Sequence, residues 1–182
     1  SQKIGESLLK KGFKEEEIIL KPIDVNVDKI RNSNPSFDLH SKYPQFKKII
    51  LMVSRLEAEK NIILALEVLS KLKAQEAQIK AQKFDIGLII VGSGSMLKKL
   101  KKASYKLKIS QNVVFVGWQT DLVSYYKGCD VFLHTAWYEG YGMVLKEAQA
   151  AGCRIVSTDV GIAREVGAEI VGWNDKSIAY GI

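Results

Sequence analysis

The sequence predicts an α/β domain, a Rossmann-like, doubly wound parallel sheet with helices on both faces. Short runs of consecutive apolar residues, the pattern of strands buried on both sides, alternate along the chain with amphipathic segments. Glycine-containing loops follow several of these runs, and the right-handed crossover rule distributes the connecting helices over both faces. Sheets of this kind bind ligands at the carboxyl ends of their strands.

Strands and helices are expected in alternation. The apolar runs predict strands at residues 48–55, 86–91, 112–116, 130–134, 155–157 and 169–171. The segments between them predict helices at residues 61–80, 96–108 and 121–127, and a helix that follows the loop 139–142 and runs through Ala151. All three prolines precede residue 45, which predicts an irregular entry segment ahead of a compact unit.

Length and composition limit the class of protein. With 182 residues, 47% hydrophobic and 26% charged, the chain resembles one globular domain and not a disordered or fibrous protein. Two cysteines and two histidines are too few for a disulfide framework or a three-histidine zinc site, and we expect no metal and no cofactor. The net charge of +7 favours an anionic partner: a nucleotide, a phosphate, nucleic acid or an acidic lipid. No apolar run approaches the ~20 residues of a membrane-spanning helix, and we expect a cytoplasmic location.

The most informative stretch runs from Glu139 to Glu147, E-G-Y-G-M-V-L-K-E. Glu139 is expected in a loop and Glu147 about one turn inside the next helix, where its side chain leans back toward the same cleft. Gly140 and Gly142 let the backbone approach a ligand, and the free amides and dipole of the helix start favour phosphate. Two acceptors around an anion site match a nucleotide-sugar, which carries hydroxyls at both ends and phosphate in the middle.

The loop after the first strand supplies cations for such a ligand. Arg55 stands at the end of the strand and Lys60 at the start of a helix. A guanidinium binds phosphate oxygens as a fork and an ammonium as a point charge, so we expect both to bind diphosphate opposite the 139–147 loop. Gly92 follows the second strand and predicts a tight turn with a backbone contact to the ligand. It does not predict an NAD fingerprint, because position 97 is Leu where a third glycine would stand.

Five blocks of the chain carry a family resemblance. They are V-S-R-L-E-A-E-K-N, I-I-V-G-S-G, V-V-F-V-G-W, D-V-F-L-H-T-A-W-Y-E-G-Y-G-M-V-L-K-E-A and V-S-T-D-V-G-I-A-R-E. In order and approximate spacing they resemble the C-terminal, donor-binding half of glycosyltransferase family 4, the group 1 glycosyltransferases of the GT-B fold. The similarity covers roughly Leu20 to Gly172. The chain departs from the family's usual pattern at Arg154, where proline is common, and at Ile162, where a second glycine is common.

The resemblance implies a role for each matching position. Glu139 would bind hydroxyls of the donor sugar and, with Arg55 and Lys60, stabilise the sugar and the leaving diphosphate during catalysis. Glu147 would bind the ribose. The positions that would bind the donor are Gly92, Trp118, Gln119, Asp121, Gly140, Tyr141, Gly142, Met143, Val144 and Glu147. No nucleophile is identified, and we expect a structural role for His134.

The resemblance also implies a reaction and a domain division. The reaction would be a retaining, metal-independent transfer of a sugar from a nucleoside-diphosphate sugar to a glycan or lipid-linked acceptor. Residues 1–30 resemble the tail of an N-terminal domain with its interdomain linker, and residues 31–182 the donor-binding domain, truncated at its C-terminus. Since the N-terminal domain would bind the acceptor, we expect the isolated chain to bind donor and transfer little or nothing.

The sequence leaves two other hypotheses open. The first is a non-catalytic nucleotide-sugar-binding module, which only the complete parent chain separates from an enzyme. The second is a nucleic-acid-binding domain, although acids in the cleft would repel a phosphate backbone and no stacking array accompanies the lysines. The lysines of the helix 96–108 predict a solvated face or, alternatively, a peripheral contact with anionic lipid. These lysines are Lys98, Lys99, Lys101, Lys102, Lys106 and Lys108.

Overall fold

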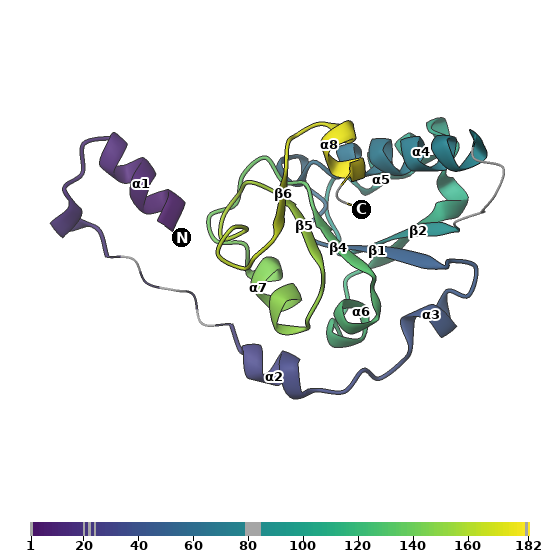
Figure 1. The fold of residues 1–182 in the computed structure, drawn as a ribbon, viewed down its shortest axis with the longest axis horizontal. Coiled ribbons are helices and arrows are strands. Elements are labelled where there is room, and N and C mark those ends of the chain that lie inside the picture. The colour runs from purple at the N-terminus through teal and green to yellow at the C-terminus, as the bar shows by residue number, and fades with distance from the viewer. Residues whose placement is uncertain (1, 20, 22, 24, 79–84, 181) are drawn as a thin grey trace.

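The chain folds around a six-stranded parallel sheet with helices on both faces (Figure 1). The computed structural model describes residues 2–19, 21, 23, 25–78, 85–180 and 182. The strand order is β3-β2-β1-β4-β5-β6. From β1 the chain adds β2 and β3 on one side. It then crosses to the other side of β1 and adds β4, β5 and β6. This confirms the predicted doubly wound sheet and places its switch point between β1 and β4.

The predicted strands are all present. They are β1 (Lys48–Val53), β2 (Ile86–Val91), β3 (Val113–Gly117), β4 (Val131–His134), β5 (Ile155–Thr158) and β6 (Glu169–Val171). The predicted helices are α4 (Ile62–Gln78), α5 (Leu97–Lys106), α6 (Val123–Gly128) and α7 (Met143–Ala150). Their ends lie within about two residues of the predicted ones, and the expected end of the helix 61–80 lies outside the described residues. Short 3-10 helices precede α4 (Ala58–Lys60) and β3 (Ser110–Asn112).

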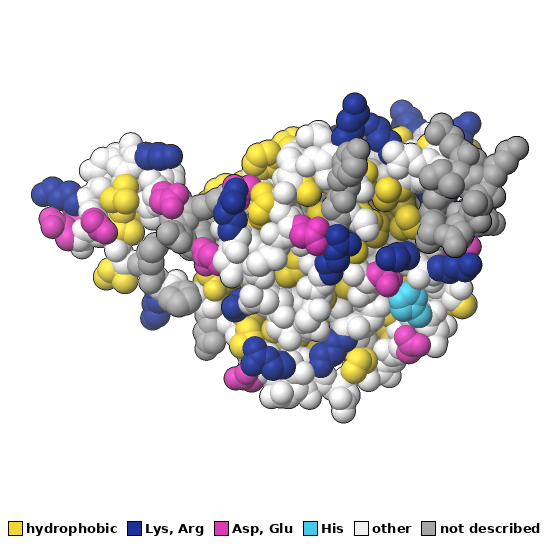
Figure 2. All heavy atoms as spheres, viewed as in Figure 1, with side chains coloured by type: hydrophobic (Ala, Val, Ile, Leu, Met, Phe, Trp, Pro, Cys, Tyr) yellow, Lys and Arg dark blue, Asp and Glu magenta, His cyan; other side chains and the backbone are white. Residues whose placement is uncertain are grey.

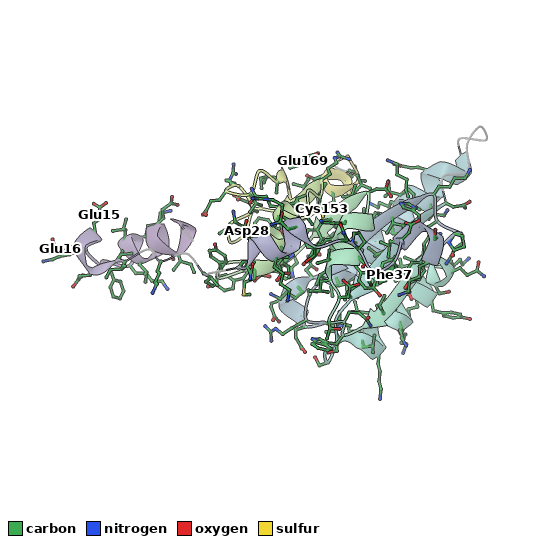
Figure 3. All side chains as sticks on the ribbon, turned by 90° about the horizontal axis from the view of Figure 1, so that it is seen from below. Glu15, Glu16, Asp28, Phe37, Cys153 and Glu169 are labelled. Carbon is green, nitrogen blue, oxygen red and sulfur yellow. The ribbon has the colours of Figure 1, made fainter. Side chains whose placement is uncertain are left out.

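The entry segment differs from the irregular one predicted. It holds α1 (Gln2–Lys10), a 3-10 turn at Glu15–Glu17, α2 (Val27–Asn32) and α3 (Leu39–Lys42); a further short helix, α8 (Asp175–Tyr180), follows β6. Side-chain caps explain two of these helices, because Asn26 accepts from the Lys29 amide and Asp38 from the His40 amide. Figure 3 shows Glu15 and Glu16 far from the body, whereas Asp28 lies where α2 runs beside it.

The strands β1, β2, β4 and β5 are buried on both faces, as their continuous apolar residues predict, whereas most of β3 and β6 at the two edges is partly exposed. In β1, Ile50 and Met52 pack with residues of α4, α5 and α8, whereas Ile49, Leu51 and Val53 pack with residues of α3, α6 and α7. Every residue of β1 after Lys48 is buried. The two layers hold the strands rigidly, so the loops at their carboxyl ends have a fixed base.

Gly92 connects the loops that follow the first two strands. Its φ is +137°, and a Cβ at this position would lie 1.9 Å from the carbonyl oxygen of Ser54. Its amide donates to the carbonyl of Gly117 at the end of β3. Glycine is required here because the two backbones touch. The hydrogen-bonded turn follows two residues later than predicted, where the amide of Leu97 donates to the carbonyl of Gly94.

Gly87 in β2 shows how closely the sheet is covered. A Cβ at this position would lie 2.2 Å from the ring of Phe46, which is itself 3% exposed. We expect Gly87→Ala to lower the free energy of unfolding by about 1–3 kcal/mol, because the extra methyl forces the buried ring to move. Urea unfolding followed by circular dichroism measures this loss.

A second substitution tests the cause. In the double variant Gly87→Ala/Phe46→Leu the smaller side chain leaves room for the methyl, so the combined loss should be less than the sum of the two single losses. Strictly additive losses of unfolding free energy would show that the ring of Phe46 does not limit the size of the side chain at position 87.

Candidate functional site

Three adjoining hollows follow the carboxyl edge of the sheet. The β3-side hollow, about 220 Å³, lies at the ends of β1, β2 and β3 and is lined by Gly92, Trp118 and Gln119 among others. The central hollow, about 380 Å³, lies between the ends of β1 and β4 and is lined by Lys60 and residues 141–144. The β6-side hollow, also about 380 Å³, lies beyond the ends of β4, β5 and β6.

Shared walls join the hollows into one track. The β3-side and central hollows share Val53, Ser54, Arg55 and Val144. The central and β6-side hollows share Glu139. The central hollow occupies the switch point between β1 and β4, where doubly wound sheets bind their ligands.

Most of the predicted site residues line this track. Those that do are Arg55, Lys60, Gly92, Trp118, Gln119, Glu139, Tyr141, Gly142, Met143 and Val144. Gly140, Asp121 and Glu147 are not among the residues that line these hollows. A Cβ on Gly140 would lie 3.9 Å from the side chain of Ile4 in α1, so its loop approaches the N-terminal helix.

An enclosed ion pair lies at the middle of the track. The Nζ of Lys60 lies 2.6 Å from Oε1 of Glu139, and the two side chains are 11% and 14% exposed. The Nε2 of His134, at the end of β4, lies 3.2 Å from the same oxygen. Burial raises the pKa of Glu139, but the adjacent His134 and Lys60 outweigh it and hold the pKa below its ordinary value of 4.5. Glu139 is therefore a carboxylate at neutral pH, able to accept hydrogen bonds.

Buried Thr135 fixes the turn that carries Lys60. Its hydroxyl donates to the carbonyl oxygens of Lys60 and Asn61, at 3.1 and 3.0 Å. Asn61 has a φ of 49°, in the left-handed region that Asn tolerates better than most residues. The amide of Trp137 also donates to the carbonyl of Glu59. The loops after β1 and β4 are thus bound to each other, which brings Lys60 and Glu139 together.

Arg55 lines two of the hollows but is held differently. Its guanidinium donates to Glu59 at 3.0 Å, and its side chain is 72% exposed. The prediction placed Arg55 and Lys60 opposite the 139–147 loop. The structure gives both cations a glutamate partner, an exposed one for Arg55 and an enclosed one for Lys60.

Gly142 shapes the start of α7. Its φ of 92° is a conformation that favours glycine, and its carbonyl accepts from the amide of Leu145 to close the first turn. The amides of Met143 and Val144 lie in that turn, where an α-helix offers no internal acceptor. Both residues line the central hollow, so the helix start borders the space beside Lys60.

Glu147 and Asp121 take part in bonds within the fold. The hydroxyl of Tyr126, in α6, donates to Oε2 of Glu147 at 2.8 Å. Burial first, and then the Glu147 carboxylate, raise the pKa of Tyr126, which keeps this hydroxyl protonated. Asp121 accepts from the amide and hydroxyl of Ser124 and from the hydroxyl of Ser36, and so ties the first turn of α6 to the entry segment.

Several side chains contact the site although the sequence did not predict them as site residues. Thr135 and Tyr126 position Lys60 and Glu147, and His134 contacts Glu139 although it was expected to be structural only. Trp137 and Tyr138 directly precede Glu139 in the sequence. Their position next to a predicted site residue could have identified them as site residues too. Trp173 follows β6, 34 positions further along the chain, and only the sheet order brings it to the track.

The comparison with known proteins identifies the family. Residues 38–173 match the family described as "Glycosyl transferases group 1". The chain belongs to the group 1 glycosyltransferases. An uncharacterized glycosyltransferase of Methanocaldococcus jannaschii, MJ1607, is 32% identical over 144 residues, which are 75% of this chain and 35% of that protein.

A second relative has a more specific name. It is the N-acetylgalactosamine-N,N'-diacetylbacillosaminyl-diphospho-undecaprenol 4-alpha-N-acetylgalactosaminyltransferase of Campylobacter jejuni, 30% identical over 112 residues, which are 62% of this chain and 28% of that protein. This chain thus spans about a third of the length of these two relatives.

Solved structures agree on the fold. Anabaena HepE in complex with UDP superposes with a TM-score of 0.82 at 19% identity, over 99% of this chain and 50% of HepE. A glycosyltransferase of Rickettsia africae superposes with a TM-score of 0.79 at 23% identity, again over 99% and 50%. At these identities the likeness shows the fold alone: the Rossmann-like α/β fold of this chain matches half of each of these solved glycosyltransferases.

Within the residues that the structure describes, no three or more His, Cys, Asp or Glu side chains gather as they would around a metal ion. No described helix combines the length and apolar character needed to cross a bilayer.

The ion pair between Lys60 and Glu139 should stabilise the fold. We expect Lys60→Met to lower the free energy of unfolding at pH 7 by about 3 kcal/mol, since removing one partner strands an enclosed charge. A carboxyl whose pKa is lowered contributes all its stabilisation above its ordinary value of 4.5 and loses it as the pH falls through the folded value. The loss in Lys60→Met should therefore shrink below about pH 4.5, as measured by urea unfolding at several pH values.

The exposed pair of Arg55 and Glu59 provides the matched control. Its 3.0 Å contact is comparably short, but its side chains are 72% and 42% exposed. Arg55→Met should cost less than about 1 kcal/mol. Equal losses in the two variants, or a Lys60→Met loss independent of pH, would contradict the role assigned to the enclosed pair.

Proposed function

We propose that the track binds a nucleoside-diphosphate sugar, the donor of a retaining, metal-independent sugar transfer. The observation that carries the proposal is the order of the hollows. A hollow with an exposed aromatic ring, a hollow with two cations and a helix start, and a hollow bordered by carboxylates adjoin in one line. Base, diphosphate and sugar follow one another in the same order in the donor.

The chemistry of each hollow matches one part of the donor. Trp118, 71% exposed in the β3-side hollow, offers its ring to the base. In the central hollow, Lys60, Arg55 and the amides at the start of α7 suit the diphosphate. Glu139 suits hydroxyls of the sugar, because its lowered pKa keeps it an acceptor. Glu147 does not line the hollows, but we assign its Oε1 to a ribose hydroxyl of the same ligand, with Tyr126 holding Oε2.

The same groups account for the transfer. As the bond to the sugar breaks, negative charge develops on the diphosphate and positive charge on the anomeric carbon. Lys60, Arg55 and the dipole of α7 stabilise the negative charge on the diphosphate. The Glu139 carboxylate stabilises the positive charge on the anomeric carbon. These charges supply what a bound metal provides in other transferases, so the proposal needs no metal.

Retention and the acceptor are proposed for the whole protein. Two relatives are named for α-linked products, the Campylobacter enzyme above and an alpha-monoglucosyldiacylglycerol synthase of Streptococcus pneumoniae that is 28% identical over 113 residues. An α-linked donor gives such a product when configuration is retained. These names contain diphospho-undecaprenol and diacylglycerol, which favours a lipid-linked or glycan acceptor here.

Glu147 should contribute to binding of the nucleotide part of the donor, and Glu139 to binding of its sugar. We expect Glu147→Ala to weaken the binding of nucleoside diphosphate about ten- to a hundredfold, the value of a hydrogen bond to a charged group. Glu139→Ala should leave that binding nearly unchanged and reduce the preference for nucleotide-sugar over nucleoside diphosphate. Calorimetric titration with UDP, GDP, ADP and their glucose derivatives measures both effects.

Glu67→Ala is the matched control, because Glu67 is exposed on α4 and distant in sequence from both motifs. It should bind every ligand as the parent chain does. The division of roles would be wrong if Glu147→Ala and Glu139→Ala affected nucleoside diphosphate equally. The donor proposal itself would fail if no nucleoside diphosphate bound at all.

We further propose that α5 contacts anionic membrane lipid. Its sequence L-K-K-L-K-K-A-S-Y-K carries no acid, and Leu100 anchors it in the core while its lysines are exposed. Figure 2 shows basic side chains over the upper right of the body, where α4 and α5 lie in Figure 1. Basic side chains near a negative surface each contribute about 1 kcal/mol.

Charge reversal tests the contact. The chain should float with vesicles that contain phosphatidylserine at low salt, and reversing Lys98, Lys99, Lys101 and Lys102 to Glu should abolish flotation. A variant with four exposed lysines reversed elsewhere, Lys10, Lys11, Lys14 and Lys29, should still float. Absence of flotation in the parent chain, or equal loss in both variants, would reject the contact.

A further inference from the structure

The β6-side hollow contains an exposed aromatic patch, made of Trp137, Tyr138 and Trp173. Their side chains are 55%, 65% and 43% exposed, although aromatic residues of this size usually lie largely buried. All three line one hollow whose volume, about 380 Å³, is in the range of ligand pockets. Grouped exposed rings in a hollow are typical of a binding site.

The two tryptophan rings are held in place. They are stacked, with centroids 6.2 Å apart and planes inclined by 17°. The Nε1 of Trp173 donates to the carbonyl of Ala136 at 3.0 Å, and the amide of Trp137 donates to the carbonyl of Glu59. A ligand that packs on these rings therefore loses little free energy in ordering them.

Polar groups surround the patch. Glu139 and Asp159 provide carboxylates, and Arg164 braces Asp159 through contacts of 3.0 and 3.1 Å. Ser7 of α1 and Lys11, which follows α1, also line the hollow. Flat apolar rings beside hydrogen-bonding side chains match a ligand with one apolar face and a polar edge.

We propose that the β6-side hollow binds a pyranose ring, with the C–H face of the sugar on the outer face of the stacked Trp137–Trp173 pair and its hydroxyls on Glu139 and Asp159. The inference rests on the proposed function, since Glu139 joins this hollow to the diphosphate end of the track. A phosphate would meet the carboxylates of Glu139 and Asp159, which already hold Lys60 and Arg164, so a neutral ligand fits this lining better than an anion does. A base has its own exposed ring, Trp118, at the far end of the track.

The pyranose has two possible sources, the sugar that is transferred or the terminal sugar of the acceptor. Both place a ring against Glu139, where the bond must break and form. They differ in one respect: a nucleotide-sugar would displace a separate glycoside if the hollow holds the transferred sugar. It would bind together with the glycoside if the hollow holds the acceptor.

Saturation-transfer NMR on the 182-residue chain tests the proposal. The probes are the methyl glycosides of glucose, galactose, mannose and N-acetylglucosamine, each added alone and then with saturating UDP, GDP or ADP. At least one glycoside should receive saturation, strongest at the ring C–H protons that face the tryptophans. Addition of the matching nucleotide-sugar then shows displacement or joint binding and so identifies the source.

Four variants locate the binding. Trp137→Ala and Trp173→Ala should weaken the responding glycoside about fivefold or more, which is the effect of losing an aromatic contact. Trp173→Phe keeps a ring and should retain most of the binding. Tyr105→Ala is the matched control, because Tyr105 is 76% exposed on α5, away from the track, and should have no effect.

The outcomes separate this inference from the donor proposal. If UDP, GDP or ADP binds but no glycoside does, or if Trp137→Ala leaves the glycoside signals unchanged, the pyranose site is wrong and the donor site stands. If a tryptophan-dependent glycoside signal is found and no nucleoside diphosphate binds, the donor proposal fails and the pyranose site stands.

Discussion

The contact between Lys60 and Glu139 joins the two halves of the doubly wound sheet at their switch point. Lys60 belongs to the loop after β1 and Glu139 to the loop after β4, and the strands that carry these loops lie side by side. An ion pair as enclosed as this one repays the cost of desolvation only when its geometry is good. Thr135, which holds the carbonyls of Lys60 and Asn61, provides that geometry.

This constraint explains why the hollows form a line. The 58–61 turn is bound to the loop after β4 by hydrogen bonds of Thr135 and Trp137 and by the Lys60–Glu139 pair, which sets the distance between these two loops. Gly92 fixes the opposite side by bringing the loop after β2 against Ser54. The hollows at the ends of β3, β1 and β6 therefore keep their order. A long ligand could lie across the strand ends without a rearrangement of the sheet.

The fold was predictable because its signals are local. Apolar runs, helical periodicity and glycine positions lie within a few residues of each element, and β1 to β6 appear where these signals place them. The short helices α2, α3 and α8 were not predicted, because with at most six residues each they are too short to show helical periodicity. Sequence pattern also placed Glu139, Lys60 and Gly142 at one sheet edge. It could not show that Lys60 binds Glu139, that Tyr126 holds Glu147 or that Trp173 stacks on Trp137, since these pairs are 79, 21 and 36 positions apart.

The pairing of both cations affects how a diphosphate could enter. Arg55 has Glu59 as partner and Lys60 has Glu139, so the charges at the central hollow nearly cancel. The exposed Arg55 can leave Glu59 at little cost, because solvent screens that contact. Lys60 need not leave, since an ammonium has three N–H groups and the bond to Glu139 uses one of them. A diphosphate could therefore bind Arg55 in place of Glu59, and could bind Lys60 through an N–H group that Glu139 does not use. Lys60 would then contact the leaving group while Glu139 contacts the sugar, which couples the two charges that develop during transfer.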